Sequence, residues 1–239
     1  MFLKENSRAW YHDYLTLYWY DQYARTEGPE NFRKYDPARI SRELIGLGAD
    51  IYVLYAVSQM GDAFYPSRVL PPHPALKGRD YVGDLAARLK RAGKRVVLYV
   101  NWGTSRHPEW REKKADGTFS QNWDINYYVP CLNSPQQDVI RRVVEELAER
   151  YECDGLSLDM YLGFERCICR FCQPHLRRLF GGRGRVTDAG IRDHMTQYAQ
   201  WRDETTGRYL ETLNAILARK GIVPFHNGFS PMESRISSG

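Results

Sequence analysis

The sequence predicts an α/β fold of the (β/α)8 TIM-barrel type. Apolar, β-branched or aromatic runs of strand length alternate with amphipathic stretches that carry helix signals, which is the pattern of a parallel sheet with crossover helices. The unit recurs five times, and no stretch has the pattern of an antiparallel meander. The length of 239 residues and the hydrophobic content of 43% fit one large domain. We therefore expect a single barrel domain over residues 1–239, truncated after its fifth βα unit.

The strands and helices follow from local signals. The five strands are expected at residues 14–20, 51–57, 95–102, 155–160 and 222–228. Asp36 and Asp80 are expected to cap two helices that end at Gly48 and Gly93. Ser134, Pro135 and Gln137 have the spacing of a capping box before a helix that reaches Tyr151, and a long helical segment is expected over about 191–220.

A doubly wound open sheet is the alternative fold, because five βα units suffice for one. Such folds usually place a glycine-rich phosphate loop after the first strand. No loop of this kind follows residues 14–20, so we favour the barrel.

Composition excludes some classes of function. The net charge of +5 comes from scattered arginines with one denser stretch at 177–185, which is typical of a solvated surface and does not favour nucleic-acid binding. No apolar run approaches the length of a membrane span, and the first residues lack the pattern of a signal peptide. We expect a cytoplasmic protein with no membrane partner. The 17 Tyr and 6 Trp fit a carbohydrate site, although such residues also serve in ordinary packing.

Three of the five cysteines fall within the stretch ERCICRFC, as Cys167, Cys169 and Cys172. A metal site, a disulfide framework and a redox motif are the possible explanations. Zinc favours four tetrahedral ligands and thiolates, and Cys131 is a candidate fourth ligand because it precedes the helix that leads into the fourth strand. Four cysteine ligands leave no open position for water, so this zinc would be structural. The absence of an export signal disfavours disulfides, and Cys153 reads as a small buried residue.

Asp159 is the strongest catalytic candidate. It stands where the apolar strand in DGLSLDM meets its loop, and the carboxyl ends of barrel strands form the active face. A carboxylate there can act as a nucleophile or a general acid, while a capping or pairing aspartate is the structural alternative. Glu233 follows the fifth strand and is a candidate second carboxylate, although it also fits an exposed loop residue.

Other polar and aromatic residues are candidates for substrate binding. Some end predicted strands, and others lie in the loops that follow strands, where His-Pro pairs can also stabilise turns. These residues are Asp21, Tyr65, His73, Asn101, Trp102, His107, His226 and Asn227.

Two families share motifs with this chain. CLNSP at 131–135 together with RCICRFCQPHLRRLFG at 166–181 resembles the zinc-bearing segment of glycoside hydrolase family 42 β-galactosidases. That resemblance implies one structural zinc on Cys131, Cys167, Cys169 and Cys172. FRKYDP, the YPS loop, HPALKGRD, HPEW, CLNSP, YECDGLSLDM and the cysteine cluster resemble the group called hypothetical glycosyl hydrolase 6, over residues 32–172.

The chain departs from family 42 at its fourth strand. That family places an Asn-Glu pair there, where this chain has Leu158 and Asp159. DGLSLD is more similar to α-fucosidases and α-galactosidases, whose nucleophilic aspartate ends strand four. The resemblance thus implies a retaining glycosidase with Asp159 as nucleophile, acting on a carbohydrate. A non-catalytic sugar-binding or scaffold barrel with a structural zinc is the alternative. Open strand edges would favour a homo-oligomer or a missing C-terminal barrel half.

Overall fold

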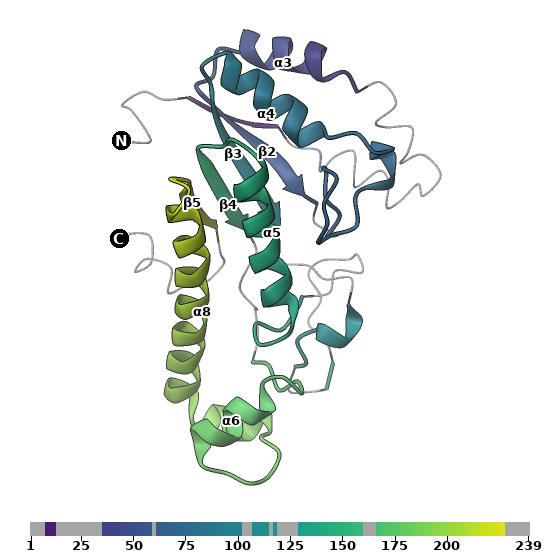
Figure 1. The fold of residues 1–239 in the computed structure, drawn as a ribbon. Coiled ribbons are helices and arrows are strands. Elements are labelled where there is room, and N and C mark those ends of the chain that lie inside the picture. The colour runs from purple at the N-terminus through teal and green to yellow at the C-terminus, as the bar shows by residue number, and fades with distance from the viewer. Residues whose placement is uncertain are drawn as a thin grey trace.

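A five-stranded parallel sheet forms the centre of the molecule (Figure 1). The computed structural model describes residues 8–12, 35–58, 61–101, 107–114, 117–118, 129–159 and 166–227. The strands are β1 (Ala9–His12), β2 (Ile51–Val57), β3 (Arg95–Asn101), β4 (Gly155–Asp159) and β5 (Val223–Asn227). They lie in the order β1-β2-β3-β4-β5, and every neighbouring pair is parallel.

This strand order distinguishes the two candidate folds. A doubly wound sheet reverses its order once, whereas the described strands follow one another in chain order, as consecutive strands of a barrel do. The α/β prediction with a parallel sheet is confirmed, and the doubly wound alternative does not hold for these strands. Closure into eight strands stays a prediction.

The strand that pairs with β2 lies earlier than expected. It is Ala9–His12, with Ala9 in register with Ile51, whereas the predicted strand at 14–20 lies outside the described residues. Contacts between segments far apart in the sequence fix this register, because the backbone of Arg8 accepts hydrogen bonds from the amides of Asp50 and Ile51 and donates one to the Asp50 carboxylate. Apolar periodicity alone could not reveal these polar contacts.

Helices cover one face of the sheet. They include α3 (Pro37–Gly46), α4 (Tyr81–Arg91), α5 (Gln136–Arg150) and α8 (Met195–Ala218), with α3 packed against α4 and α5 against α8 (Figure 1). The Tyr52 hydroxyl donates to the Leu44 carbonyl of α3 at 2.6 Å, so the face that holds Tyr52 is the helix-covered one. Within each strand, the residues directly before and after one on the helix-covered face point to the other face of the sheet.

The helix starts test the capping predictions. Asp36 accepts from the Ala38 amide and Asp80 from the Gly83 amide, at 2.9 and 2.8 Å, so both predicted N-caps are confirmed. The predicted capping box is confirmed only in part: Pro135 is the N-cap residue of α5 and is already in the right-handed helical region, whereas the Ser134 hydroxyl accepts the amide of Gln136, the first residue of the helix, at 3.4 Å.

The described part of the segment between β4 and β5, residues 166–222, holds three helices. α6 (Gln173–Phe180) was not predicted, although Pro174 in its first turn and Gly181, with a φ of 69°, are ordinary helix signals. The helix expected over 191–220 is two helices, α7 (Asp188–Asp193) and α8, which separate at His194. Figure 1 shows α6 far from the sheet and α8 returning from it to β5. Short 3-10 turns occur at Pro74–Leu76 and Pro108–Trp110.

In the part of the chain that the structure describes, none of the helices has the length and apolar character needed to cross a membrane.

Candidate functional site

The carboxyl ends of β3, β4 and β5 bring three of the predicted site residues together. Asp159 is in register with Asn101 on β3 and with Asn227 on β5. Asn101 and Asp159 are 3% and 9% exposed. Neighbouring strands are about 4.8 Å apart, and in-register residues share a face. The Asp159 carboxylate therefore stands at this edge on the face opposite the helices, with Asn101 and Asn227 at the same register on the two neighbouring strands.

Tyr99 is a further member of this site that the sequence analysis did not identify. Its hydroxyl donates a hydrogen bond to Oδ2 of Asp159. Burial, followed by the negative charge of Asp159, raises the pKa of Tyr99 well above its ordinary value. The phenol is therefore a hydrogen-bond donor throughout the working pH range.

Tyr55 on β2 supports Tyr99 from the other side. The two residues are in register, and their ring centroids are 4.1 Å apart. A signal for this pair exists in the sequence, because the tripeptide VLY occurs at 53–55 and again at 97–99. Two strands that carry the same tripeptide in register place their tyrosines side by side.

His226 belongs to a different environment from Asn227. It is in register with Leu158, so it points to the helix-covered face. Its Nε2 lies 2.9 Å from Oδ1 of Asn214 on α8, and burial lowers the pKa of His226. The structure therefore does not bring the imidazole together with Asp159.

Tyr65 and His73, the candidates in the loop after β2, are both buried and held by contacts with other parts of the fold or of the loop. Tyr65 is fully buried, and its hydroxyl donates to Oε2 of Glu146 on α5 at 2.9 Å. The Ser67 hydroxyl and the Arg68 amide donate to the same carboxylate, so Glu146 fastens this loop to the helix layer. His73 is buried, with its amide donating to the Ala63 carbonyl and its ring 5.5 Å from that of Phe64.

His107 lies near the cysteines. Its ring stacks on Trp110 with centroids 3.7 Å apart, and its Nδ1 is 3.0 Å from Oε1 of Glu109. The Trp110 carbonyl accepts the amide of Cys131 at 2.7 Å, so the HPEW stretch braces the loop that presents this cysteine. The other predicted site residues, Asp21, Trp102 and Glu233, lie outside the described residues.

Four buried cysteines converge at one point. The sulfur atoms of Cys131, Cys167, Cys169 and Cys172 all lie within 4.8 Å of one another, and all are free thiols. The sulfurs of Cys131 and Cys172 are 3.3 Å apart, far beyond the roughly 2.05 Å of a disulfide bond. Sulfurs bound to one zinc at about 2.3 Å each lie roughly 3.8 Å apart in a tetrahedron. The cluster can therefore hold a metal such as zinc.

The four cysteines shift one another's pKa values in different directions. Hydrogen bonds from the Cys131, Cys167 and Cys172 thiols lower the pKa of Cys169, whereas the contacts of Cys131 with the other three cysteines, together with burial, raise the pKa of Cys131. Thiolate is the metal-binding form, so bringing four such groups together favours a cation among them. Cys153 lies apart, and burial raises the pKa of its thiol to about 12.

Asn133 and Tyr198 form hydrogen bonds with the residues of the cysteine cluster. The backbone amide of Asn133 donates to the Cys131 sulfur at 3.4 Å, and its side-chain amide donates to the Cys172 sulfur at 3.5 Å. The Cys167 amide donates to the hydroxyl of Tyr198 on α8 at 2.9 Å. These contacts join the HPEW, CLNSP and ERCICRFC segments to the start of α8, a set that sequence spacing did not predict.

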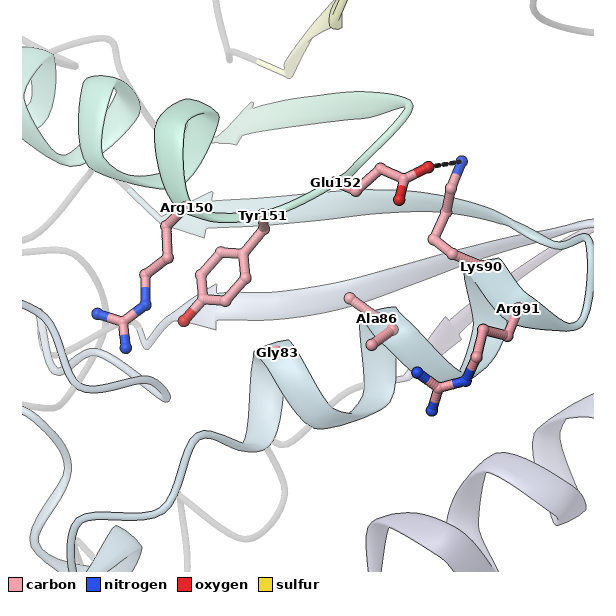
Figure 2. Close-up of a pocket in the computed structure, with 8 residues that line it drawn as sticks. Gly83, Ala86, Lys90, Arg91, Arg150, Tyr151 and Glu152 are labelled. Carbon is pink, nitrogen blue, oxygen red and sulfur yellow. Dashed lines mark ion pairs between the residues drawn. The ribbon is translucent and has the colours of Figure 1, made fainter.

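A separate groove of about 430 Å³ lies at the other end of the sheet. Its lining comes from α4 and from residues 150–152, and Figure 2 shows Arg150 and Tyr151 at one end with Arg91 on α4 at the other. Residues 150–152 directly precede β4, whereas Asp159 is the last residue of that strand. Lys90, in the same wall, is already paired with Asp154 at 2.8 Å. The groove is thus distinct from the strand-end site.

The comparisons with known proteins agree with this architecture. The sequence profile of the family described as hypothetical glycosyl hydrolase 6 matches residues 36–160, a range that includes β2 to β4, Cys131 and Asp159. A search of curated proteins found no match.

Two solved structures are similar over most of this chain. An α-L-fucosidase, isoenzyme 2 from Paenibacillus thiaminolyticus, has 24% identity and a TM-score of 0.64, with 82% of this chain and 29% of that chain covered. The PgaB (BpsB) glycoside hydrolase domain from Bordetella bronchiseptica has 14% identity and a TM-score of 0.60, with 92% and 65% covered. The chain therefore spans under a third of the first and under two thirds of the second, and at these identities the likeness shows the fold alone.

Proposed function

The chain belongs to the hypothetical glycosyl hydrolase 6 family, and from this premise we propose that it is a retaining glycosidase whose nucleophile is Asp159. One observation carries the proposal. A buried carboxylate ends β4 in register with Asn101 on β3 and Asn227 on β5, at the edge of the sheet where barrel enzymes hold their substrates.

The chemistry proceeds in two displacements. A carboxylate oxygen of Asp159 forms a bond to the anomeric carbon while the bond from that carbon to the glycosidic oxygen breaks, and a second carboxylic acid gives its proton to the departing oxygen. In the next step the same second group takes a proton from water, whose oxygen replaces Asp159 at the anomeric carbon. Retention requires the two carboxyl groups to lie roughly 5 to 5.5 Å apart. We propose Glu233 for the second group, with a carboxylate on a further barrel strand as the alternative.

The two carboxamides suit a sugar ligand. Each offers a donor and an acceptor, and sugar hydroxyls need both. Because Asn101 and Asn227 flank the nucleophile, we propose that they hydrogen-bond to the sugar hydroxyls nearest the anomeric carbon. Asp21 and Trp102, at other predicted strand ends, are further proposed contacts.

A structural zinc is the proposed cofactor. Cys131, Cys167, Cys169 and Cys172 would hold it, and the sulfur cluster that they form fits four tetrahedral thiolate ligands. Its role is to join the segments around residues 107–114, 131–134 and 166–173. Four protein ligands leave the ion no position for water or substrate, so the catalytic groups must come from the strand ends.

A second candidate function is a non-catalytic sugar-binding barrel. Among the ends of the five described strands, Asp159 is the one carboxylate, since the others end in His12, Val57, Asn101 and Asn227. A barrel with a single strand-end carboxylate can bind a sugar without cleaving it.

Activity measurements separate the two candidates. We would assay a panel of aryl glycosides, aryl α-L-fucosides included, with the wild type, with Asp159→Asn, and with Asp203→Asn on the exposed face of α8 as the matched control. The glycosidase proposal expects Asp159→Asn to lose at least about 1000-fold in kcat, with the control unchanged. Turnover that survives in Asp159→Asn would remove the nucleophile assignment. Sugar binding without turnover in the wild type would favour the second candidate.

A further inference from the structure

We propose that Tyr99 is the positioning residue of Asp159, fixing the orientation and the ionised state of the carboxylate through a hydrogen bond to Oδ2. The inference rests on the proposed function in taking Asp159 as the nucleophile. It adds a residue from the interior of β3, which ends no strand and which no motif of the sequence singled out.

The sheet geometry determines which groups meet. Tyr99 is in register with Ser157, two residues before Asp159 on the same face of β4. Because Ser157 is small, the Tyr99 ring can extend along β4 until its hydroxyl reaches Oδ2 of Asp159. Strand β2 contributes the Tyr55 ring on the far side of Tyr99, and Asn227 on β5 is in register with Asp159. The phenol is thus held between a ring and a carboxylate.

In the contact between Tyr99 and Asp159, the phenol is the donor and the carboxylate is the acceptor. Both residues are buried, with Tyr99 4% and Asp159 9% exposed. A buried phenol beside a carboxylate keeps its proton, so it donates, and an ionised carboxylate is the better acceptor. The bond therefore favours the charged form of Asp159, which is the form that attacks. It also engages Oδ2, so the plane of the carboxylate is set and Oδ1 is the oxygen that we assign to attack.

A purely structural tyrosine would need no such contact. The ring of a phenylalanine fills the same space against Tyr55, so Tyr99→Phe removes the hydroxyl and keeps the packing. This variant therefore separates the two roles. Tyr209→Phe is the matched control, because the Tyr209 hydroxyl donates to the Gln137 carbonyl in the helix layer and has no part in the strand-end site.

The test compares wild type, Tyr99→Phe and Tyr209→Phe over a range of pH with the best aryl glycoside of the panel. We expect kcat of Tyr99→Phe to fall about 10- to 100-fold, the range for losing one hydrogen bond to a charged group. KM should stay within about threefold, and the acidic limb of the kcat/KM profile should move up by about one pH unit, because the ionised form has lost a donor. Tyr209→Phe should keep the wild-type profile. An unshifted profile with wild-type kcat in Tyr99→Phe would overturn the inference.

A second measurement does not depend on turnover. The free energy of unfolding is measured for wild type, Tyr99→Phe, Asp159→Asn and the double variant. We expect Tyr99→Phe to change the unfolding equilibrium constant at least about fivefold more in the presence of Asp159 than in the Asp159→Asn background. Additive effects would refute the contact between the two side chains. Non-additive effects on the free energy of unfolding, in a wild type that shows no turnover, would contradict the glycosidase proposal. They would still support Tyr99 as the residue that positions Asp159.

Discussion

The side-chain amide of Asn133 donates a hydrogen bond to the sulfur of Cys172, at 3.5 Å. The same residue donates its backbone amide to the sulfur of Cys131, so one asparagine of the CLNSP stretch contacts two of the four converging cysteines. Four thiolates on one divalent cation carry a net charge of −2. Hydrogen bonds from neighbouring amides disperse that charge and hold the sulfurs in place.

Asn133→Ala should therefore weaken zinc binding. The backbone contact to Cys131 survives the substitution and the side-chain contact to Cys172 is lost, so we expect affinity to fall by about tenfold, at the lower end of the range for groups around metal ligands. Competition with a chromogenic chelator measures the change. Asn214→Ala, on α8 beside His226, is the control and should keep wild-type affinity. Equal affinities for wild type and Asn133→Ala would contradict this role for the amide.

Zinc itself should be present at one ion per chain. Elemental analysis of the purified protein tests the stoichiometry. Cys131→Ser should lose the metal and lower the melting temperature, because the ion joins three chain segments and its binding energy is folding energy. Cys153→Ser should retain the full zinc content, since that sulfur lies outside the cluster. Zinc-free protein with an unchanged melting temperature would refute the assignment.

A clamp between α4 and the start of β4 should contribute to stability. Both carboxylate oxygens of Asp154 accept from Lys90, at 2.8 and 2.9 Å, and Oδ2 also accepts the Val96 amide. Asp154→Ala leaves the ammonium and the amide without this partner, and we expect a loss of about 2 kcal/mol in the free energy of unfolding. Glu152→Gln is the control: its side chain is 85% exposed and 3.9 Å from Lys90, so the loss should stay under about 0.5 kcal/mol. Denaturant unfolding that gives equal losses for the two variants would count against the clamp.

His226 should make stability depend on pH. Burial lowers the pKa of His226 in the folded protein, so the unfolded chain binds a proton more readily. The stabilisation from the neutral ring is complete above the unfolded pKa of about 6.5 and is lost as pH falls below it. Between pH 7.5 and 5, the free energy of unfolding should fall less in His226→Gln than in wild type. Parallel curves for the two proteins would show that this ring does not contribute.

The sequence predicts strands and helix starts well where the signal is local. Residues 51–57 form β2 as expected, and Asp36 and Asp80 cap their helices, because the deciding contacts lie within a few residues. Asn101, Asp159 and Asn227 also lie at the ends of their strands, as predicted, while their functional roles stay predictions. The strand Ala9–His12 was not predicted, because its register depends on Arg8 and Asp50, which are 42 positions apart.

Contacts across the fold account for the rest. The hydrogen bond from Tyr99 to Asp159 joins residues 60 positions apart, and the partner of His226 is on α8. Which face of a strand a residue occupies follows from register, and register follows from pairing. His226 and Asn227 were therefore both predicted to bind substrate at the end of the fifth strand, but His226 lies on the helix-covered face. The cysteine cluster was the easier case, since three of its four members lie within six positions.

Trapping the glycosyl-enzyme intermediate would show which carboxylate is the nucleophile. The full chain would be incubated with a panel of activated 2-deoxy-2-fluoro glycosides, which slow the hydrolysis of a covalent intermediate, and then digested and analysed by mass spectrometry. We predict one adduct in the wild type, located on the peptide that contains Asp159, and no adduct in Asp159→Asn. An adduct on another carboxylate, or the same adduct in Asp159→Asn, would contradict it.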